Sequence, residues 1–336
     1  MDRFHYTKVT SIAQALEIGH HAKTAQQGAD VRYIAGGTTL LDLMKLDVER
    51  PVRVVDINKL GLDRVETSAD GGLRIGALVR NSDLAHHVTV ARDYRVLSEA
   101  LLSGASGQLR NMATTGGNLL QRTRCMYFRD VAMPCNKREP GTGCSAIDGE
   151  NRSLAILGTS SHCIATNPSD MNVALAALEA VVHVRSLNGE RAIPFQDFHL
   201  LPGDTPQRET VLEPGDLVTH VTLPALSAGT TSTYLKLRDR ASYEFALASA
   251  AVVVNATAGR FDRVRVAMGG VGTKPWRMMD VERALTGKAV SDETIRAVAA
   301  AALGDATPQS KNGFKVELGR RCLAQALRLA TGLARA

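Results

Sequence analysis

The sequence predicts a mixed α+β protein made of two compact units. The chain has 336 residues, and a domain has roughly 150. Strand-type and helix-type hydrophobic patterns alternate along it, without an internal repeat, a heptad pattern or a low-complexity tract. Proline, serine and glycine gather near residues 225–229. We therefore expect one unit at residues 1–225 and a second α+β unit at residues 229–336.

The first unit opens with alternating elements. Each double glycine or capping residue separates one hydrophobic pattern from the next. We expect a helix at residues 12–20, a strand at 31–34, a turn at Gly36-Gly37, a helix at 40–46, strands at 52–57 and 72–79, a short helix from Asn81 and a helix at 91–102.

The middle of the chain interrupts this pattern. From residue 121 to residue 163 the hydrophobic period collapses, and four of the five cysteines fall in this stretch, as expected of an insertion held by something other than a core. Regular elements then resume. We expect a helix at 171–180 capped by Ser169, a hairpin at 181–194 around Asn188-Gly189, strands at 217–223, 233–237, 248–256 and 263–268, and helices from 277, after Ser291 and at the C-terminal end.

The composition is that of an ordinary folded protein. Hydrophobic residues make up 44% and charged residues 22%, which excludes a disordered or fibrous chain. A net charge of +6 favours acidic ligands or partners. It does not indicate nucleic-acid binding, because aromatic residues are only 4% and no Lys or Arg run exceeds two residues.

The chain carries no predicted membrane segment or export signal. Its longest apolar runs, such as residues 246–254, stay well short of the roughly 20 residues that span a bilayer. The segment Met1–Tyr6 lacks the basic and then apolar layout of a secretory signal. We expect a soluble protein assembled in the cytoplasm, which a partner with its own signal could still carry into the periplasm.

Two double glycines stand out as candidate binding elements. Gly36-Gly37 lies between a predicted strand and a predicted helix, where backbone N–H groups can approach a phosphate. For one double glycine, a tight turn with positive φ is the simpler explanation. Gly116-Gly117 repeats the pattern, which makes a shared diphosphate ligand as good an explanation as two separate turns. The sequence has no Gly-x-Gly-x-x-Gly dinucleotide motif and no Walker loop.

The cysteines of the irregular segment are candidate metal ligands. Nine, eight and eighteen residues lie between successive cysteines, whereas structural zinc sites use pairs of cysteines with two to four residues between them. The spacing leaves an iron–sulfur cluster, zinc, and unligated or disulfide-bonded thiols open. We expect Cys322 to be a small buried thiol in the last helix. The segment's candidate ligands are Cys125, Cys135, Cys144 and Cys163, and its basic neighbours, expected to offset thiolate charge, are Arg122, Arg124, Lys137 and Arg138.

Single polar residues support a function less strongly. Asp170 follows Ser169 and is most simply a first-turn helix acid, although such a carboxylate can also face a sugar hydroxyl. Lys236 and Arg240 are expected on a solvated strand edge. No HExxH motif and no nucleophile elbow is present.

Several motifs resemble one family. Residues 33–45 and 104–118 resemble the FAD-binding subunit of molybdenum hydroxylases, the xanthine dehydrogenase family in the broad sense. The stretches 166–171, 236–243 and 266–277 extend the likeness over nearly the whole chain. The cysteine segment is similar to that of the middle subunit of bacterial periplasmic aldehyde oxidoreductases, whose insertion holds a 4Fe-4S cluster.

The resemblance implies a vanillyl-alcohol-oxidase-type (PCMH-type) FAD-binding fold in two subdomains, followed by an α+β domain like that of the CO dehydrogenase flavoprotein. Asp170 would reach the ribityl or ribose hydroxyls, and Val218 and Lys236 would border the flavin. Tyr243 would lie on the loop over the isoalloxazine ring. The FAD pyrophosphate would be wrapped by Tyr33, Ile34, Ala35, Gly36, Gly37, Thr38, Thr39 and Leu40. The opposing wall would be formed by Thr114, Thr115, Gly117 and Asn118.

The resemblance also implies a function. The chain would be the FAD subunit of a heterotrimer with a molybdenum-cofactor large subunit and a 2Fe-2S small subunit, in which aldehyde oxidation takes place on a partner. Electrons would pass through this chain to an external acceptor, and the insertion 121–164 would hold a 4Fe-4S cluster that serves as relay, charge-tuning group or structural staple. The alternatives are the FAD subunit of a xanthine dehydrogenase or aromatic hydroxylase, a stand-alone FAD oxidase, and a zinc-stapled scaffold. The four cluster ligands would be Cys125, Cys135, Cys144 and Cys163.

Overall fold

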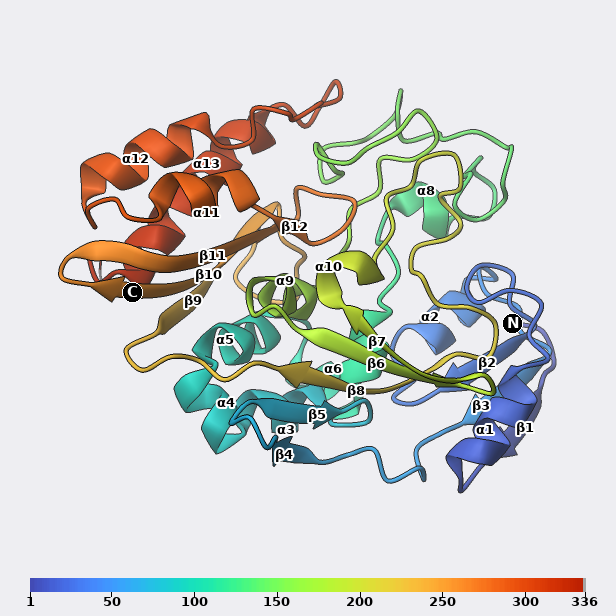
Figure 1. The fold of residues 1–336 in the computed structure, drawn as a ribbon. Coiled ribbons are helices and arrows are strands. Elements are labelled where there is room, and N and C mark those ends of the chain that lie inside the picture. The colour runs from blue at the N-terminus through green and yellow to red at the C-terminus, as the bar shows by residue number, and fades with distance from the viewer. Residues whose placement is uncertain (335–336) are drawn as a thin grey trace.

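The computed structural model describes residues 1–334, which form three sheets with helices packed around them (Figure 1). In residues 1–60 a small parallel sheet has the order β1-β3-β2. Strands that run parallel in one sheet need a crossover connection, and a helix capped by Ser11 connects β1 to β2, which lie on either side of β3. The elements are β1 (His5–Lys8), α1 (Ile12–Gly19), β2 (Val31–Ile34), α2 (Leu40–Lys45) and β3 (Arg53–Asp56).

The second subdomain is a five-stranded antiparallel sheet with the order β4-β5-β8-β6-β7. The helix expected at residues 91–102 is divided at Tyr94 into α4 and α5, because Tyr94 leaves helical geometry with φ −115° and ψ 46°. The elements are β4 (Val65–Thr67), β5 (Leu73–Gly76), α3 (Asn81–His86), α4 (Val88–Asp93), α5 (Arg95–Ser103), α6 (Gly107–Met112), α7 (Thr115–Leu119), α9 (Asp170–Ala177), β6 (Val181–Ser186), β7 (Gly189–Pro194), α10 (Phe195–Phe198) and β8 (Leu217–Leu223).

The C-terminal part is a four-stranded antiparallel sheet with the order β12-β11-β10-β9, covered on one face by α13. Cys322 is fully buried in α13, so the expectation of a buried thiol there is confirmed. The elements are β9 (Thr231–Leu237), β10 (Ala248–Thr257), β11 (Arg260–Gly269), β12 (Trp276–Arg277), α11 (Met279–Leu285), α12 (Asp292–Ala301) and α13 (Phe314–Ala330).

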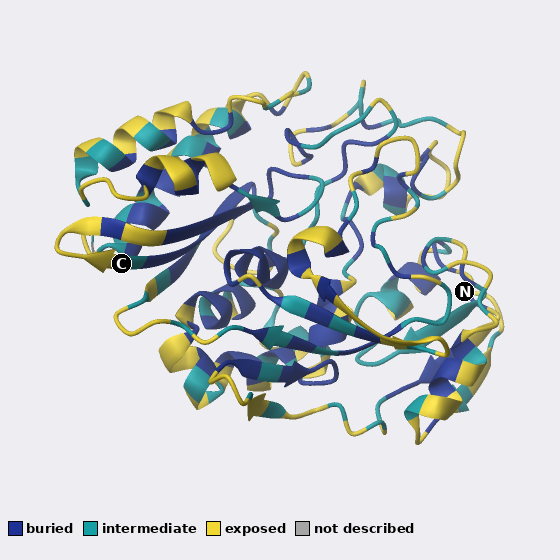
Figure 2. Cartoon of the chain, in the orientation of Figure 1, coloured by how far each residue is buried: buried dark blue, intermediate teal, exposed yellow. Residues whose placement is uncertain are grey.

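One helix connects the second subdomain to the C-terminal sheet. All eight residues of α9 are buried, and α9 packs on β10 and β11 as well as on α5 (Figure 2). A single core cluster therefore includes Leu175 of α9, Val182 of β6 and Val253 of β10. The chain passes from β8 to β9 through residues 224–230, but the hydrophobic core continues across that connection.

The cysteine segment is the irregular part of the structure, seen as long loops around α8 (Met126–Arg129) (Figure 1). Its far end is attached to the beginning of α13 by the fully buried Lys315. The Lys315 ammonium donates to the carbonyls of Ser153, Leu154 and Gly270 at 3.1, 2.8 and 2.5 Å. Burial lowers the pKa of Lys315 to about 7, whereas three acceptor carbonyls favour the charged form.

No helix among the described residues is long and apolar enough to cross a bilayer.

The sheet of the second subdomain contains a pair of histidines that makes stability depend on pH. His183 on β6 and His220 on β8 lie opposite each other and stack with ring centroids 4.1 Å apart. Burial, and then the neighbouring charge of His183 and Arg74, lowers the pKa of His220 to about 4. Burial followed by Arg74 also lowers the pKa of His183.

The pKa of His220 in the folded protein lies below the unfolded value of about 6.5, so the unfolded chain binds a proton first as the pH falls. The folded state therefore has its full stability above pH 6.5 and loses part of it as the pH falls towards 4. We expect the midpoint of thermal unfolding to drop less between pH 7 and pH 5 in His220→Gln than in the unaltered protein. Equal drops in the two proteins would show that the pair does not set this pH dependence.

Candidate functional site

The two double-glycine segments meet in space. A Cβ on Gly36 would lie 1.9 Å from the carbonyl oxygen of Met112 and 3.2 Å from Cα of Ala113, so only glycine fits there. Gly37 follows with φ +72° and leads the chain into α2, which confirms the positive-φ turn at this position. The chain leaving β2 is thereby held against the residues that precede Thr114.

The second double glycine is part of a short helix. Thr114 caps α7, and its hydroxyl accepts a hydrogen bond from N–H of Gly117 at 3.2 Å. Neither Gly116 nor Gly117 has positive φ, so the tight-turn explanation is wrong for this pair. The space at position 116 is tight, because a Cβ there would lie 3.1 Å from Cβ of Ala77 and would push Ala77 back by a few tenths of an ångström.

Arg80 and Asn58 fix the two segments relative to each other. The guanidinium of Arg80 donates to the carbonyl of Met112 and, at 3.2 Å, to Oδ1 of Asn58. The side-chain amide of Asn58 in turn donates to the carbonyl of Ala35 at 3.0 Å. The side chains of Arg80 and Asn58 thus supply the hydrogen-bond donors for the carbonyls of Met112 and Ala35.

A cavity of about 210 Å³ opens where these segments meet. Residues from α3, α5, α6, α7, α9 and β9, from the turn before α2 and from the loop after β9 contribute to its wall. The predicted site residues that line it are Thr38, Thr39, Gly117, Asn118, Asp170, Lys236 and Tyr243.

The other predicted residues lie behind this wall. The hydroxyl of Tyr33 donates to the carbonyls of Ala15 and Gly215, and Val218 is buried in the main core. Thr114 and Thr115 are buried in the cap of α7. The remaining residues form the end of β2, the turn and the start of α2, namely Ile34, Ala35, Gly36, Gly37 and Leu40. Their contact with FAD, and that of the lining residues, stays a prediction.

Asp170 is the most strongly bonded acid of the cavity. Its Oδ1 accepts from the hydroxyl of Tyr234 at 2.5 Å, and its Oδ2 pairs with Nζ of Lys236 at 2.8 Å. The side chain of Lys236 is only 3% exposed, so the expectation of a solvated strand edge is wrong for Lys236. Alternation along β9 places Tyr234 and Lys236 on the same face, which α5 and α9 cover. Burial, and then Asp170, raises the pKa of Tyr234, which keeps its hydroxyl protonated as a donor.

Several lining residues were not predicted from the sequence. Asn81 is buried, and its side-chain oxygen has no hydrogen-bond partner among residues 1–334, so an acceptor is left for a ligand. Gln121 and Arg124 come from the start of the cysteine segment, and Phe245 from the loop after β9. For Arg124 the sequence offers one signal, its position next to Cys125. The other lining residues have none, because contacts between distant segments leave no local pattern in the sequence.

The four cysteines of the irregular segment gather around one small core. Cys125, Cys135 and Cys163 are buried in it with Phe128, and Cys144 packs against it. Cys135 and Cys144 face each other in an isolated antiparallel bridge. All five cysteines of the chain are free thiols, against the disulfide-bonded alternative. Within residues 1–334, no group of three or more Cys, His, Asp and Glu side chains is placed to hold a single metal ion.

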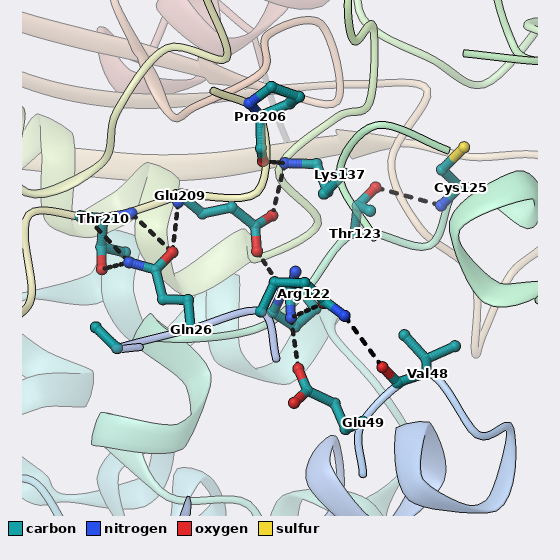
Figure 3. A network of polar contacts seen from close by, with 12 residues as sticks. Gln26, Val48, Glu49, Arg122, Thr123, Cys125, Lys137, Pro206, Glu209 and Thr210 are labelled. Carbon is teal, nitrogen blue, oxygen red and sulfur yellow. Dashed lines mark hydrogen bonds and ion pairs between the residues drawn. The ribbon is translucent and has the colours of Figure 1, made fainter. Parts of the chain in front are cut away.

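A buried network of charges fixes the start of this segment (Figure 3). Arg122 is 5% exposed and pairs with Oε1 of Glu49 at 2.5 Å and with Glu209. Nζ of Lys137 bonds to Oε1 of Glu209 at 3.0 Å and to the carbonyl of Pro206 at 2.8 Å. Burial disfavours the charge of Glu209, but Arg122 and Lys137 hold its pKa below the ordinary value.

These contacts change the expectation for the basic residues near the cysteines. Arg122 and Lys137 are neutralised by the buried Glu49 and the partly buried Glu209, and Arg124 pairs with Asp42 at 2.9 Å. The guanidinium of Arg138 donates to the backbone carbonyls of residues 127, 128 and 133. The segment therefore carries less uncompensated positive charge than its sequence suggests.

Comparisons with known proteins identify the class. Residues 2–226 match the FAD-binding domain in molybdopterin dehydrogenase, and residues 232–330 match the C-terminal domain of the CO dehydrogenase flavoprotein. The chain belongs to the FAD-binding subunits of the molybdenum hydroxylase family, which confirms the resemblance and the expected fold class.

Particular relatives cover nearly the whole chain. The chain is 50% identical to the aldehyde oxidoreductase FAD-binding subunit PaoB of Escherichia coli, over 97% of this chain and 98% of that one. It is 28% identical to the glyceraldehyde dehydrogenase medium chain of Sulfolobus acidocaldarius, over 91% and 89%. The fold matches a chain of carbon monoxide dehydrogenase from Hydrogenophaga pseudoflava with a TM-score of 0.76 and 25% identity, covering 98% of both chains.

Proposed function

We propose that this chain is the electron-transfer subunit of a heterotrimeric, molybdenum-dependent aldehyde oxidoreductase, and that it carries a 4Fe-4S cluster in addition to FAD. The observation that carries the proposal is one cavity in which both double-glycine segments, the pair Asp170–Lys236 and the start of the cysteine segment converge. Half of the residues are identical to those of an aldehyde oxidoreductase subunit, which favours an aldehyde as the substrate of the complex.

The residues of the cavity fit FAD. Thr38 and Thr39, which the Gly36-Gly37 turn positions at the wall, and the side-chain amide of Asn118 would hold the pyrophosphate, and the side-chain oxygen of Asn81 would accept a ligand hydrogen bond. Asp170 would accept a bond from a ribityl or ribose hydroxyl, while Lys236 keeps its carboxylate in place. Tyr243 would limit access from the side of the loop.

Flavin in this cavity would supply the ability to take up electrons in pairs and release them singly or in pairs, which suits a carrier that serves an external acceptor. Aldehyde oxidation adds an oxygen from water and releases two electrons and two protons. We assign that reaction to the molybdenum-cofactor subunit, and we assign electron delivery to a 2Fe-2S subunit.

The cysteine segment fits an iron–sulfur cluster. Its four thiols share one small core. The ligands of a cubane cluster bind four different iron atoms, so such ligands lie farther apart than the ligands of a single metal ion. Burial raises the pKa of Cys125 to about 12, so loading the site would displace thiol protons. Cys125 also lines a cavity together with Asp170 and Phe245 of the flavin cavity, which supports a place beside the flavin.

Cys135→Ser tests the proposal. In the purified complex we expect a loss of about four iron atoms per heterotrimer. If the cluster is a relay, the complex assembles, can still be saturated with FAD and shows slower flavin reoxidation, whereas a purely structural cluster makes the complex fail to assemble. Cys322→Ser is the matched control, because Cys322 is buried in α13, outside the cysteine core. Full iron content in Cys135→Ser would refute the cluster.

The stand-alone oxidase alternative predicts a different result. A flavoprotein that oxidises its own substrate would lose the absorption of oxidised flavin when the isolated chain is mixed with an aldehyde. We expect the isolated chain, loaded with FAD, to stay oxidised in that experiment and to become reduced only within the assembled complex.

A further inference from the structure

Arg124 stands between the flavin cavity and the cysteine core. It lines the cavity of about 210 Å³ whose wall includes Thr39, Asn118 and Tyr243. It also lines a neighbouring cavity of about 180 Å³, to which Cys125 contributes. The two cavities have Asp170 and Phe245 in common as well, so Arg124 belongs to the partition between them.

Two side-chain contacts and its place in the chain hold Arg124 in this partition. Its Nη1 pairs with Oδ2 of Asp42 on α2 at 2.9 Å, and its guanidinium carbon lies 5.2 Å from the ring centroid of Phe245. Its backbone continues directly into Cys125, whose side chain is buried in the cysteine core. One side chain therefore connects the helix after the first glycine turn, the loop that covers the cavity and the cysteine segment.

Removing Arg124 would affect Phe245 more than it would affect Asp42. Arg129 binds the same carboxylate with two bonds of 2.9 and 3.1 Å, so Asp42 keeps a partner when Arg124 is removed. Phe245 is 40% exposed and packs on the Arg124 guanidinium at the cavity wall. A planar cation over an aromatic ring contributes about 0.5 to 2 kcal/mol, equivalent to a change of about twofold to thirtyfold in an equilibrium constant.

We propose that Arg124 is a positioning residue that couples the cysteine site to the flavin cavity. An ordered cysteine segment places Arg124, Arg124 seats Phe245 at the wall of the cavity, and the seated wall retains the flavin. By reciprocity, a bound flavin favours the ordered, loaded cysteine site to the same degree. This inference rests on the proposed function, in which FAD occupies the cavity and a cluster occupies the cysteine site.

The test is the dissociation constant of FAD, measured by the quenching of FAD fluorescence on the deflavinated complex. We expect Arg124→Gln to weaken FAD binding by more than twofold and by up to about thirtyfold while iron content is unchanged. Arg129→Gln removes the other partner of Asp42 on the same segment but lines neither cavity, and we expect it to stay within about twofold of the unaltered complex. Equal effects of the two variants, or a loss of iron in Arg124→Gln, would overturn the proposal.

Phe245 provides a second measurement that a general loss of stability would not imitate. Phe245→Leu removes the ring and should weaken FAD binding as much as Arg124→Gln does, whereas Phe245→Tyr keeps the ring and should retain the original affinity. A Phe245→Leu variant that binds FAD as tightly as the unaltered complex would overturn the role of the contact.

A double-mutant cycle separates coupling from two independent effects. Cys135→Ser should weaken FAD binding, and adding Arg124→Gln should produce little further loss, because the first change already releases Arg124. Effects that multiply would show that Arg124 does not transmit the state of the cysteine site. If the unaltered complex binds no FAD, or if Cys135→Ser keeps its iron, the proposed function itself fails, and these outcomes are distinct from multiplicative effects.

Discussion

Replacing Arg122 by methionine should lower the free energy of unfolding by about 3–5 kcal/mol, the usual result of removing one partner of a buried ion pair. The side chain of Glu49 is fully buried and would lose its closest cation, since Arg32 reaches the same carboxylate only at 3.8 Å. Glu209 would keep only Lys137. The measurement is the urea midpoint of the purified chain, with the slope checked for two-state behaviour.

The exposed pair Arg208–Glu213 is the control for this prediction. Both side chains are about half exposed, so Arg208→Met should change the free energy of unfolding by less than about 1 kcal/mol. Adding Glu49→Gln to Arg122→Met should restore part of the lost stability, because it removes the orphaned charge. A loss of 1 kcal/mol or less in Arg122→Met would mean that the network does not hold the cysteine segment in place.

Gly36→Ala should weaken FAD binding by up to about a hundredfold, because the new methyl group cannot occupy the position 1.9 Å from the Met112 carbonyl. One of the two glycine segments must move away from the other, and such overpacking costs about 1–3 kcal/mol. The cost appears in binding, because the cavity wall depends on both segments. The measurement is FAD affinity by fluorescence quenching.

Gly107→Ala is the matched control in the same region. A Cβ on Gly107 has no neighbour within 4 Å, and its φ is not positive. We expect Gly107→Ala to bind FAD as the unaltered chain does. If Gly36→Ala and Gly107→Ala have the same affinity, the close approach of the two segments is not what shapes the site.

Local patterns predicted much of the fold. The strand at residues 31–34 has the expected bounds, the hairpin of β6 and β7 turns at Asn188, and Ser169 and Ser291 cap helices as expected. The division at Tyr94 was missed, because residues on both sides of it continue one helical hydrophobic pattern. Strand β1 was missed as well, because the short segment His5–Lys8 is mostly exposed and shows no buried alternation.

The site was predictable only in part. The two double glycines could be recognised from sequence, but their direct contact depends on Met112 and Asn58, which carry no signal of their own. The burial of Lys236 depends on α5 and α9 covering the face of β9, a contact between distant segments. The pairing of the basic residues with Glu49 and Glu209 likewise joins positions about 70 to 90 residues apart.

The most direct test of the electron-carrier account is the absorption of the flavin in the assembled complex during anaerobic mixing with benzaldehyde. The account predicts that the visible band of oxidised flavin disappears as the aldehyde is oxidised and returns when an artificial electron acceptor is added. A flavin band that stays unchanged while benzaldehyde is converted to benzoate would contradict the account.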